Sequence, residues 1–331
     1  MRALAQHNRL NGLEQTPLPN RLLPSKPTFT GHQTFALRTG WLKKGIDALH
    51  LVGPDVFGRD DALVTLGVGK NMVQSIRHWL IATRMATENH QPSGRSMQAT
   101  SLGAALFGCE ASPGGQKNSG WDPFLEDDAT LWLLHWQLAG PGSMAYSWIW
   151  TFSHFRSADF TKAMLLESLE ISADVRLPKP PSRETMTRDL ECLLHTYVVA
   201  AESTSVLDTI DCPLNTLGLI RPSVNQHYRF NTGPKPMLPP EIFLYAMIQF
   251  WQWRGSDRTL TTHDLTYAEG SPGRIFKLDA DSILYYLDDL DSISSGAFRF
   301  DDAALTPQVI QNTAAASLDH LAMELLEGYY S

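Results

Sequence analysis

The sequence predicts a mainly α-helical protein with an N-terminal winged helix-turn-helix, a helical middle domain and a C-terminal winged-helix-like domain. Three observations support this prediction. A short helix, a glycine turn, a longer amphipathic helix and a β-hairpin pattern follow one another between residues 60 and 106. The middle of the chain is rich in tryptophan and in apolar segments of helical length. The C-terminal third repeats the order of helices followed by a strand.

The N-terminal part divides into an arm and a domain. Residues 1–27 are polar and contain four prolines, so we expect a flexible arm. The DNA-binding domain is expected over residues 28–110. Its first helix is indicated by Leu42, Ile46 and Leu49, which recur at helical spacing. Basic residues stand close to these apolar positions, as expected of a helix near a DNA backbone.

The longer helix of this domain is predicted over Lys70–Thr83, a segment without Pro or Gly. Val73, Ile76 and Leu80 repeat at helical spacing and predict a face that packs on a core. The side chains that can bond bases and phosphates lie on or beside a second stripe: Lys70, Asn71, Gln74, Arg77 and His78. An ordinary solvated helix face is the alternative. The preceding turn and the following hairpin pattern favour DNA contact.

Further basic residues are candidates for DNA contact. Four cations of the N-terminal domain are expected on phosphates: Arg38, Lys43, Lys44 and Arg84. His32 is equally compatible with a phosphate ligand, a catalytic base, a helix cap and a core position. Lys235 and Arg274 stand beside proline and glycine, where they either contact phosphate or stabilise turns.

Composition and charge limit the possible functions. The 331 residues carry 43% hydrophobic and 19% charged residues, which describes a folded protein with a large core. The net charge of −8 argues against a protein that coats nucleic acid generally, but residues 1–110 carry +5 and the remainder −13. No signal peptide or membrane span is indicated. Three distant cysteines suggest neither a disulfide framework nor a zinc site, so we expect a reducing cytoplasm.

The rest of the chain is expected to form two domains, over residues 111–232 and 233–331. Four helices are predicted in the first: Ala129–Leu138, Met144–Phe155, Phe160–Ser168 and Arg183–Ala200. Three helices and a strand are predicted in the second: Glu241–Trp253, Thr262–Tyr267, Asp279–Asp289 and a strand that begins at Ala297. The last of these helices is acidic, which suits a protein-interaction module better than a DNA reader, because phosphates would repel it.

Several blocks of the sequence resemble a bacterial family known as a domain of unknown function. They are residues 31–38 with 40–44, 66–73 with 75–77 and Trp79, 211–214 with 217–220, 228–230 with 233–236, and 271–274 with Phe276. This similarity extends from about Phe29 to Leu290. The family includes the SspB-type protein of single-stranded DNA phosphorothioation, in which sulfur replaces a non-bridging phosphate oxygen of DNA.

The resemblance implies a role in DNA nicking within an antiphage defence system. It also implies three partners besides DNA: a cysteine desulfurase, an ATP-dependent sulfur-transfer enzyme and an ATPase. No catalytic or metal-binding residue can be assigned from it.

The residues themselves leave the chemistry open. A nickase would need carboxylates that hold Mg²⁺ or Mn²⁺. The candidate acids are Asp122, Glu126, Asp127, Asp128, Glu202, Asp208 and Asp211, for which solvated acidic loops are the favoured alternative. Two other functions are therefore kept. One is a non-catalytic DNA-binding adaptor that recruits modification enzymes, and the other is a transcriptional regulator of a defence operon.

Overall fold

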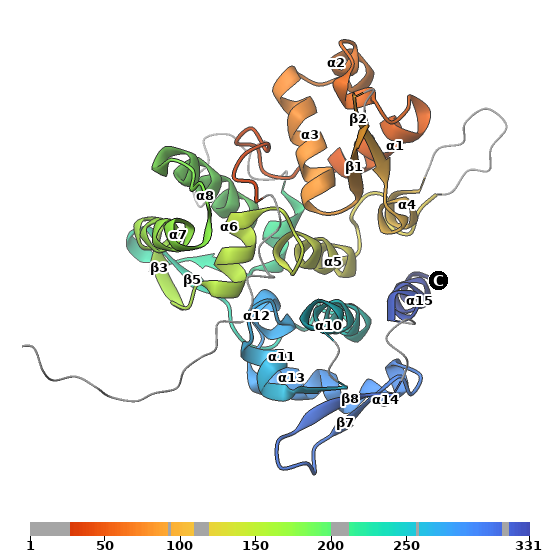
Figure 1. Cartoon of the computed structure of the whole chain (residues 1–331), viewed down its shortest axis with the longest axis vertical. Coiled ribbons are helices and arrows are strands. Elements are labelled where there is room, and N and C mark those ends of the chain that lie inside the picture. Colours follow the sequence, from red (N-terminus) through yellow and green to blue (C-terminus); the bar gives the residue numbers. More distant parts are fainter. Residues whose placement is uncertain (1–26, 92–93, 109–118, 200–211, 256–257, 313–317) are drawn as a thin grey trace, which may run out of the picture.

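The structure is a computed structural model that describes residues 27–91, 94–108, 119–199, 212–255, 258–312 and 318–331. Helices dominate this part of the chain, as the sequence predicts, and the sheets are small. Figure 1 shows the N-terminal helices and hairpin at one end and the last strands at the other, with α5, α6 and α12 between them. Among the described helices, none has both the length and the apolar character needed to cross a bilayer.

The N-terminal part follows the predicted order of helix, turn, helix and hairpin. Its elements are α1 (Trp41–Leu51), the 3₁₀ turn η1 (Val56–Gly58), α2 (Ala62–Leu66), α3 (Lys70–Ala82), β1 (Ala86–Gln91), β2 (Gly94–Ala99) and α4 (Ser101–Phe107). Gly67 ends α2 with φ of 60°, a left-handed conformation that costs glycine little. The two strands pair antiparallel, as the predicted hairpin requires.

The centre of the molecule is built on two mostly apolar helices, α5 (Asp128–Ala139) and α10 (Pro240–Arg254). Every residue of α5 after Asp128 is buried, including Trp132 and Trp136. A helix without a polar face must be enclosed by other elements, so the expected tryptophan-rich core is confirmed. The predicted helix over Met144–Phe155 is instead a short helix, α6 (Tyr146–Ile149), continued by a wider π-helical turn, η2 (Trp150–His154).

The middle region contains a sheet that the sequence analysis did not predict. Its elements are β3 (Asp159–Thr161), α7 (Lys162–Arg176), α8 (Arg183–Tyr197), the 3₁₀ turns η3 (Pro213–Leu217) and η4 (Val224–Gln226), β4 (Ile220–Pro222) and β5 (His227–Phe230). The strands are antiparallel in the order β3-β5-β4. Each strand has only three or four residues, too few to show the alternation of apolar and polar residues by which a strand is recognised.

The C-terminal region repeats this topology. Its elements after α10 are β6 (Thr259–Thr261), α11 (Thr262–Tyr267), α12 (Pro272–Phe276), α13 (Ala280–Asp288), α14 (Leu290–Ile293), β7 (Phe298–Asp301), β8 (Gln308–Gln311) and α15 (Leu318–Tyr330). The strand order β6-β8-β7 matches β3-β5-β4. In both regions a short strand leads directly into helices, and the last strand of a hairpin returns to pair with the first. The expected helices over residues 241–253, 262–267 and 279–289 are present, whereas α12 and α15 were not predicted.

Candidate nucleic-acid interface

The exposed face of α3 is short and lies at the beginning of the helix. Lys70, Asn71 and Gln74 are exposed, whereas Val73 and Ile76 are buried on the core side. No side chain caps the first turn of α3, because its N-cap is Gly69. The free backbone N–H groups of a helix start favour anions, so Lys70 and the first turn together form a local positive surface.

Arg77 continues this face but is held by the hairpin. Its guanidinium forms an ion pair with Glu88 on β1, and both side chains are largely buried, with exposed fractions of 29% and 16%. This ion pair links α3 to the first strand of the hairpin, β1. A phosphate that binds Arg77 would therefore have to compete with the Glu88 carboxylate.

The basic residues before α3 lie on or near α1, and each already has an intramolecular contact. Lys43 forms an ion pair with Asp47 one turn later. The Nζ atom of Lys44 donates to the Leu66 carbonyl at 2.9 Å, at the end of α2, and the side chain is exposed. Arg38 lies 5.5 Å from the ring centres of both Phe35 and Trp41. Lys44 is therefore the cation of this group most accessible to a ligand.

His32 and His78 do not belong to the exposed face. His78 is 7% exposed, and its ring centre lies 5.5 Å from that of His32. Burial, with smaller effects of His32 and Arg77, lowers the pKa of His78 to about 3, so its imidazole is neutral. A neutral buried ring cannot attract phosphate, so His78 is not part of the candidate interface.

His32 is joined to the middle region by a hydrogen bond to Asp189 on α8. The distance between His32 Nε2 and Asp189 Oδ1 is 2.7 Å, and the backbone N–H of Thr34 donates to His32 Nδ1. Because Nδ1 accepts, Nε2 carries the proton that is donated to Asp189. Ser75 on α3 donates to the His32 carbonyl, so this histidine fixes α3 against the middle region.

Asp189 was not among the predicted functional residues, although its position in the helix gave an indication. It lies three residues after Met186 and four before Leu193, which places a carboxylate on the apolar face of α8. Burial raises the pKa of Asp189, an effect that the hydrogen bond from His32 opposes. A buried acid of this kind requires a partner, and His32 supplies it from 157 residues away.

The other three predicted phosphate ligands are engaged inside the fold. Arg84, in a left-handed conformation with φ of 58°, donates to the Gly140 and Pro141 carbonyls. Lys235 is 6% exposed and donates to three carbonyls, and burial lowers its pKa to about 8. Arg274 donates through Nε to the Ser153 carbonyl at 3.1 Å. Arg84 and Lys235 therefore stabilise turns, which is the alternative that the sequence left open for Lys235.

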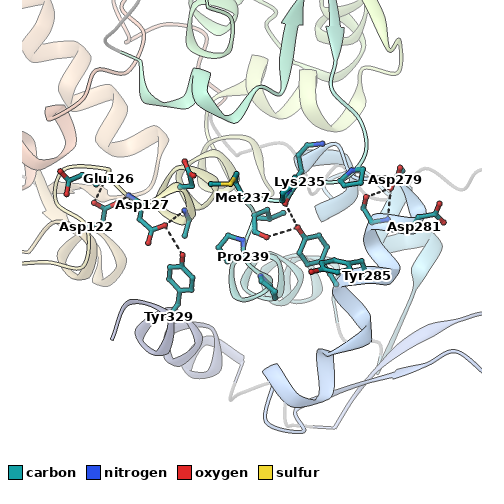
Figure 2. Close-up of a pocket in the computed structure, with 18 of the residues that line it drawn as sticks. Asp122, Glu126, Asp127, Lys235, Met237, Pro239, Asp279, Asp281, Tyr285 and Tyr329 are labelled. Carbon is teal, nitrogen blue, oxygen red and sulfur yellow. Dashed lines mark hydrogen bonds between the residues drawn. The ribbon is translucent and has the colours of Figure 1, made fainter.

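A large cavity of about 1110 Å³ lies beside α5, α13 and α15 (Figure 2). Its walls carry Asp122, Glu126, Asp127, Asp279 and Asp281, with Lys235 as a cation. The aromatic rings of Tyr285 and Tyr329 lie on the side of the C-terminal helices (Figure 2). The cavity is therefore acidic, and it does not extend the basic face of α3.

Two carboxylates of this cavity, Asp122 and Asp127, hold the local fold. Asp122 accepts from the backbone N–H groups of Glu126 and Asp127, at 2.9 and 3.1 Å. Asp127 caps α5 at the N–H of Ala129 and accepts from the Tyr329 hydroxyl at 3.2 Å. Among the described residues, no three His, Cys, Asp or Glu side chains converge as a metal site would require. Three of the candidate acids lie outside the described residues: Glu202, Asp208 and Asp211.

Comparisons with known proteins agree with this architecture. The model of a family described as "Protein of unknown function (DUF4007)" matches residues 29–330. A crystal structure of magnesium ion-bound SspB is 27% identical in sequence, with a TM-score of 0.83 over 94% of this chain and 89% of that chain. A second SspB crystal structure has the same identity and coverage and a TM-score of 0.82. None of the curated proteins matches this sequence. Because the family model covers far more than half of the sequence, the chain belongs to the DUF4007 family.

Proposed function

We propose that this protein is a DNA-binding component of a bacterial DNA phosphorothioation system. The observation that carries the proposal is the exposed start of α3, where Lys70, Asn71 and Gln74 stand free of internal packing in front of an uncapped helix end. The similarity to SspB over nearly the whole chain supports the choice of system. A cytoplasmic location and the cysteine desulfurase, sulfur-transfer enzyme and ATPase as partners follow from the same proposal.

In this proposal residues 28–110 act as a winged helix-turn-helix. α3 would enter the major groove, and the β1–β2 hairpin would contact the backbone. The regions over residues 111–232 and 233–331 would be two further winged-helix-like modules, which their common strand order supports. α13 of the last module exposes Asp281, Asp288 and Tyr285, so we assign it to a protein partner instead of DNA.

We further propose that the protein nicks DNA. The family resemblance and the magnesium in one SspB structure support this activity. The described residues do not fit a preformed magnesium site, because Asp122 and Asp127 already accept from backbone N–H groups. Because Asp122 and Asp127 are engaged by backbone N–H groups, a second candidate function is favoured. It is a non-catalytic adaptor that brings modification enzymes to DNA.

The DNA-binding proposal is tested with a fluorescently labelled duplex and the full-length protein. Replacing Lys70 by Ala (Lys70→Ala) should make the negative slope of log K against log salt shallower by about 0.9, as expected for the loss of one phosphate contact. Lys162→Ala on α7 is the matched control, because it removes a cation that is paired with Glu191 at 2.7 Å. Equal salt slopes for the Lys70→Ala protein and the wild type would contradict the proposed interface.

Nicking is tested by relaxation of supercoiled plasmid with magnesium, with manganese or with a chelator. Metal-dependent open circles would support the nickase. Binding in the duplex experiment without strand breaks would support the adaptor.

A further inference from the structure

Four basic side chains gather where the middle and C-terminal regions meet. Arg156 follows η2, Arg176 ends α7, Arg274 is on α12, and His154 is the last residue of η2. We call Arg156, Arg176, Arg274 and His154 the arginine cluster. Its members come from three segments that are far apart in the sequence, and Figure 1 shows α12 and α3 on opposite sides of α5 and α6.

One carboxylate lies among these groups. Glu269 Oε1 is 2.8 Å from His154 Nδ1 and 3.6 Å from Arg176 Nη2. Burial raises the pKa of Glu269, but His154, Arg176 and Arg156 together bring it below its usual value. Within the described part of the chain, no other carboxylate forms an ion pair with the cluster. Three guanidinium groups thus face one negative charge, which leaves an excess of positive charge.

Two polar atoms of the cluster are buried without a partner. Arg274 Nη2 and His154 Nε2 have no hydrogen-bond partner among the described residues. The His154 side chain is 6% exposed. Leaving a buried donor unpaired costs about 1–3 kcal/mol, so the Arg274 guanidinium is suited to a ligand that accepts hydrogen bonds.

Hydrogen bonds with Ser153, in η2, and with Ser271 fix the position of Arg274. Its Nε atom donates to the Ser153 carbonyl at 3.1 Å, and the Ser153 hydroxyl accepts from the Gly270 N–H at 2.6 Å. The Ser271 side chain caps α12 at the Arg274 N–H. These bonds hold the guanidinium in place before any ligand binds, which reduces the entropic cost of binding.

The cluster is accessible from outside. Arg156 is exposed, and Arg176 and Glu269 are about one-third exposed. Planar guanidinium groups bind phosphate through paired hydrogen bonds. We propose that the arginine cluster is a phosphate-binding site that holds a DNA backbone phosphate at a distance from α3. The choice of DNA as the source of the phosphate rests on the proposed function, whereas the phosphate site itself does not.

The test uses the full-length protein and three variants, Arg156→Gln, Arg274→Gln and Arg188→Gln. Arg188 is the matched control, since it is 55% exposed, pairs with Glu184 on α8 and lies outside the cluster. The first readout is the salt slope of binding to a labelled duplex. The second is the melting temperature with added inorganic phosphate, compared with sodium chloride at equal ionic strength, because a ligand that binds the folded state raises Tm.

We expect Arg156→Gln and Arg274→Gln each to make the negative salt slope shallower by about 0.9 and to weaken duplex binding up to about tenfold. Both should also abolish the phosphate-dependent rise in Tm, while Arg188→Gln behaves as wild type. Loss of the Tm effect with an unchanged DNA slope would support the site and assign it to free phosphate. If Arg274→Gln does not fold, exposed Arg156 carries the test alone.

The site is overturned if the Arg156→Gln protein retains the wild-type salt slope and the wild-type response to phosphate. That result is distinct from a failure of the proposed function. If the wild-type protein does not bind duplex DNA, DNA binding fails, and the phosphate response still decides the site. If Lys70→Ala alone weakens DNA binding and phosphate has no effect, the proposed function stands without this site.

Discussion

The buried imidazole of His78 makes the stability of the fold dependent on acid. In the folded state its pKa is lowered to about 3 by burial first, and then by His32 and Arg77. In the unfolded chain it titrates at the ordinary value of about 6.5. Below that pH the unfolded state binds a proton that the folded state does not. Stability is therefore fully present above about pH 6.5 and falls as the pH falls toward 3.

The size of the effect follows from the two pKa values. Each pH unit between them costs about 1.4 kcal/mol for one histidine. At pH 5 the loss from His78 is therefore about 2 kcal/mol relative to pH 7. His135, whose pKa is also lowered to about 3 by burial, adds a similar loss. The whole protein should lose about 4 kcal/mol from these two groups over this range.

Urea denaturation of the wild type and of His78→Gln at pH 7, 6 and 5 measures this dependence. The comparison uses only the change in unfolding free energy between pH 7 and pH 5, so any effect of the substitution on stability at pH 7 cancels. The loss of the His78→Gln variant between pH 7 and 5 should be about 2 kcal/mol smaller than that of the wild type. His50→Gln on α1 is the control, since His50 is exposed and the buried ring remains. Identical pH dependence of the wild type and His78→Gln would refute a buried neutral His78.

Three further substitutions test packing and capping, each by urea denaturation at neutral pH. Gly103→Ala should destabilise by about 3 kcal/mol, because the new Cβ would lie 2.0 Å from the Met85 carbonyl oxygen, whereas Gly58→Ala, with open space at its Cβ, should have little effect. Equal stabilities for these two variants would argue against close packing of α4. Asp189→Ala should cost about 3 kcal/mol, since it leaves the His32 Nε2–H without its acceptor; a loss below about 1 kcal/mol would mean that water replaces the carboxylate. Asp127→Ala removes the cap of α5 and should cost about 1 kcal/mol, and an unchanged midpoint would show that the cap is dispensable.

The sequence was sufficient for the helices that carry a clear local pattern. The apolar spacing of Val73, Ile76 and Leu80 predicted α3 and its core face, and α3 spans Lys70–Ala82. The helix predicted over Ala129–Leu138, in the apolar and tryptophan-rich middle of the chain, is α5, and it is buried. These features depend on the 3.6-residue repeat of the helix, which a short stretch of sequence contains in full.

The burial of α3 on a second side, where His78 lies, could not be predicted from apolar spacing. His78 was placed with the basic stripe, but the loop that carries Gly31 and His32 covers it. A Cβ on Gly31 would lie 2.6 Å from His78 Nδ1, which shows how closely the loop approaches. The sequence around His78 gives no sign of this contact, because the residues that cover it are distant in the sequence. The exposed part of α3 is therefore shorter than its composition indicates.

By itself, the sequence determined the helical class, the helix, turn, helix and hairpin order at the N-terminus, and the tryptophan-rich core. The tertiary structure alone decided which polar residues face a ligand. It buried His32 against Asp189, used Asp127 as a cap, and brought Arg156 and Arg274 together around Glu269. The physical reason is that helix formation follows from neighbouring residues, whereas burial and charge pairing depend on segments that meet only when the whole chain packs.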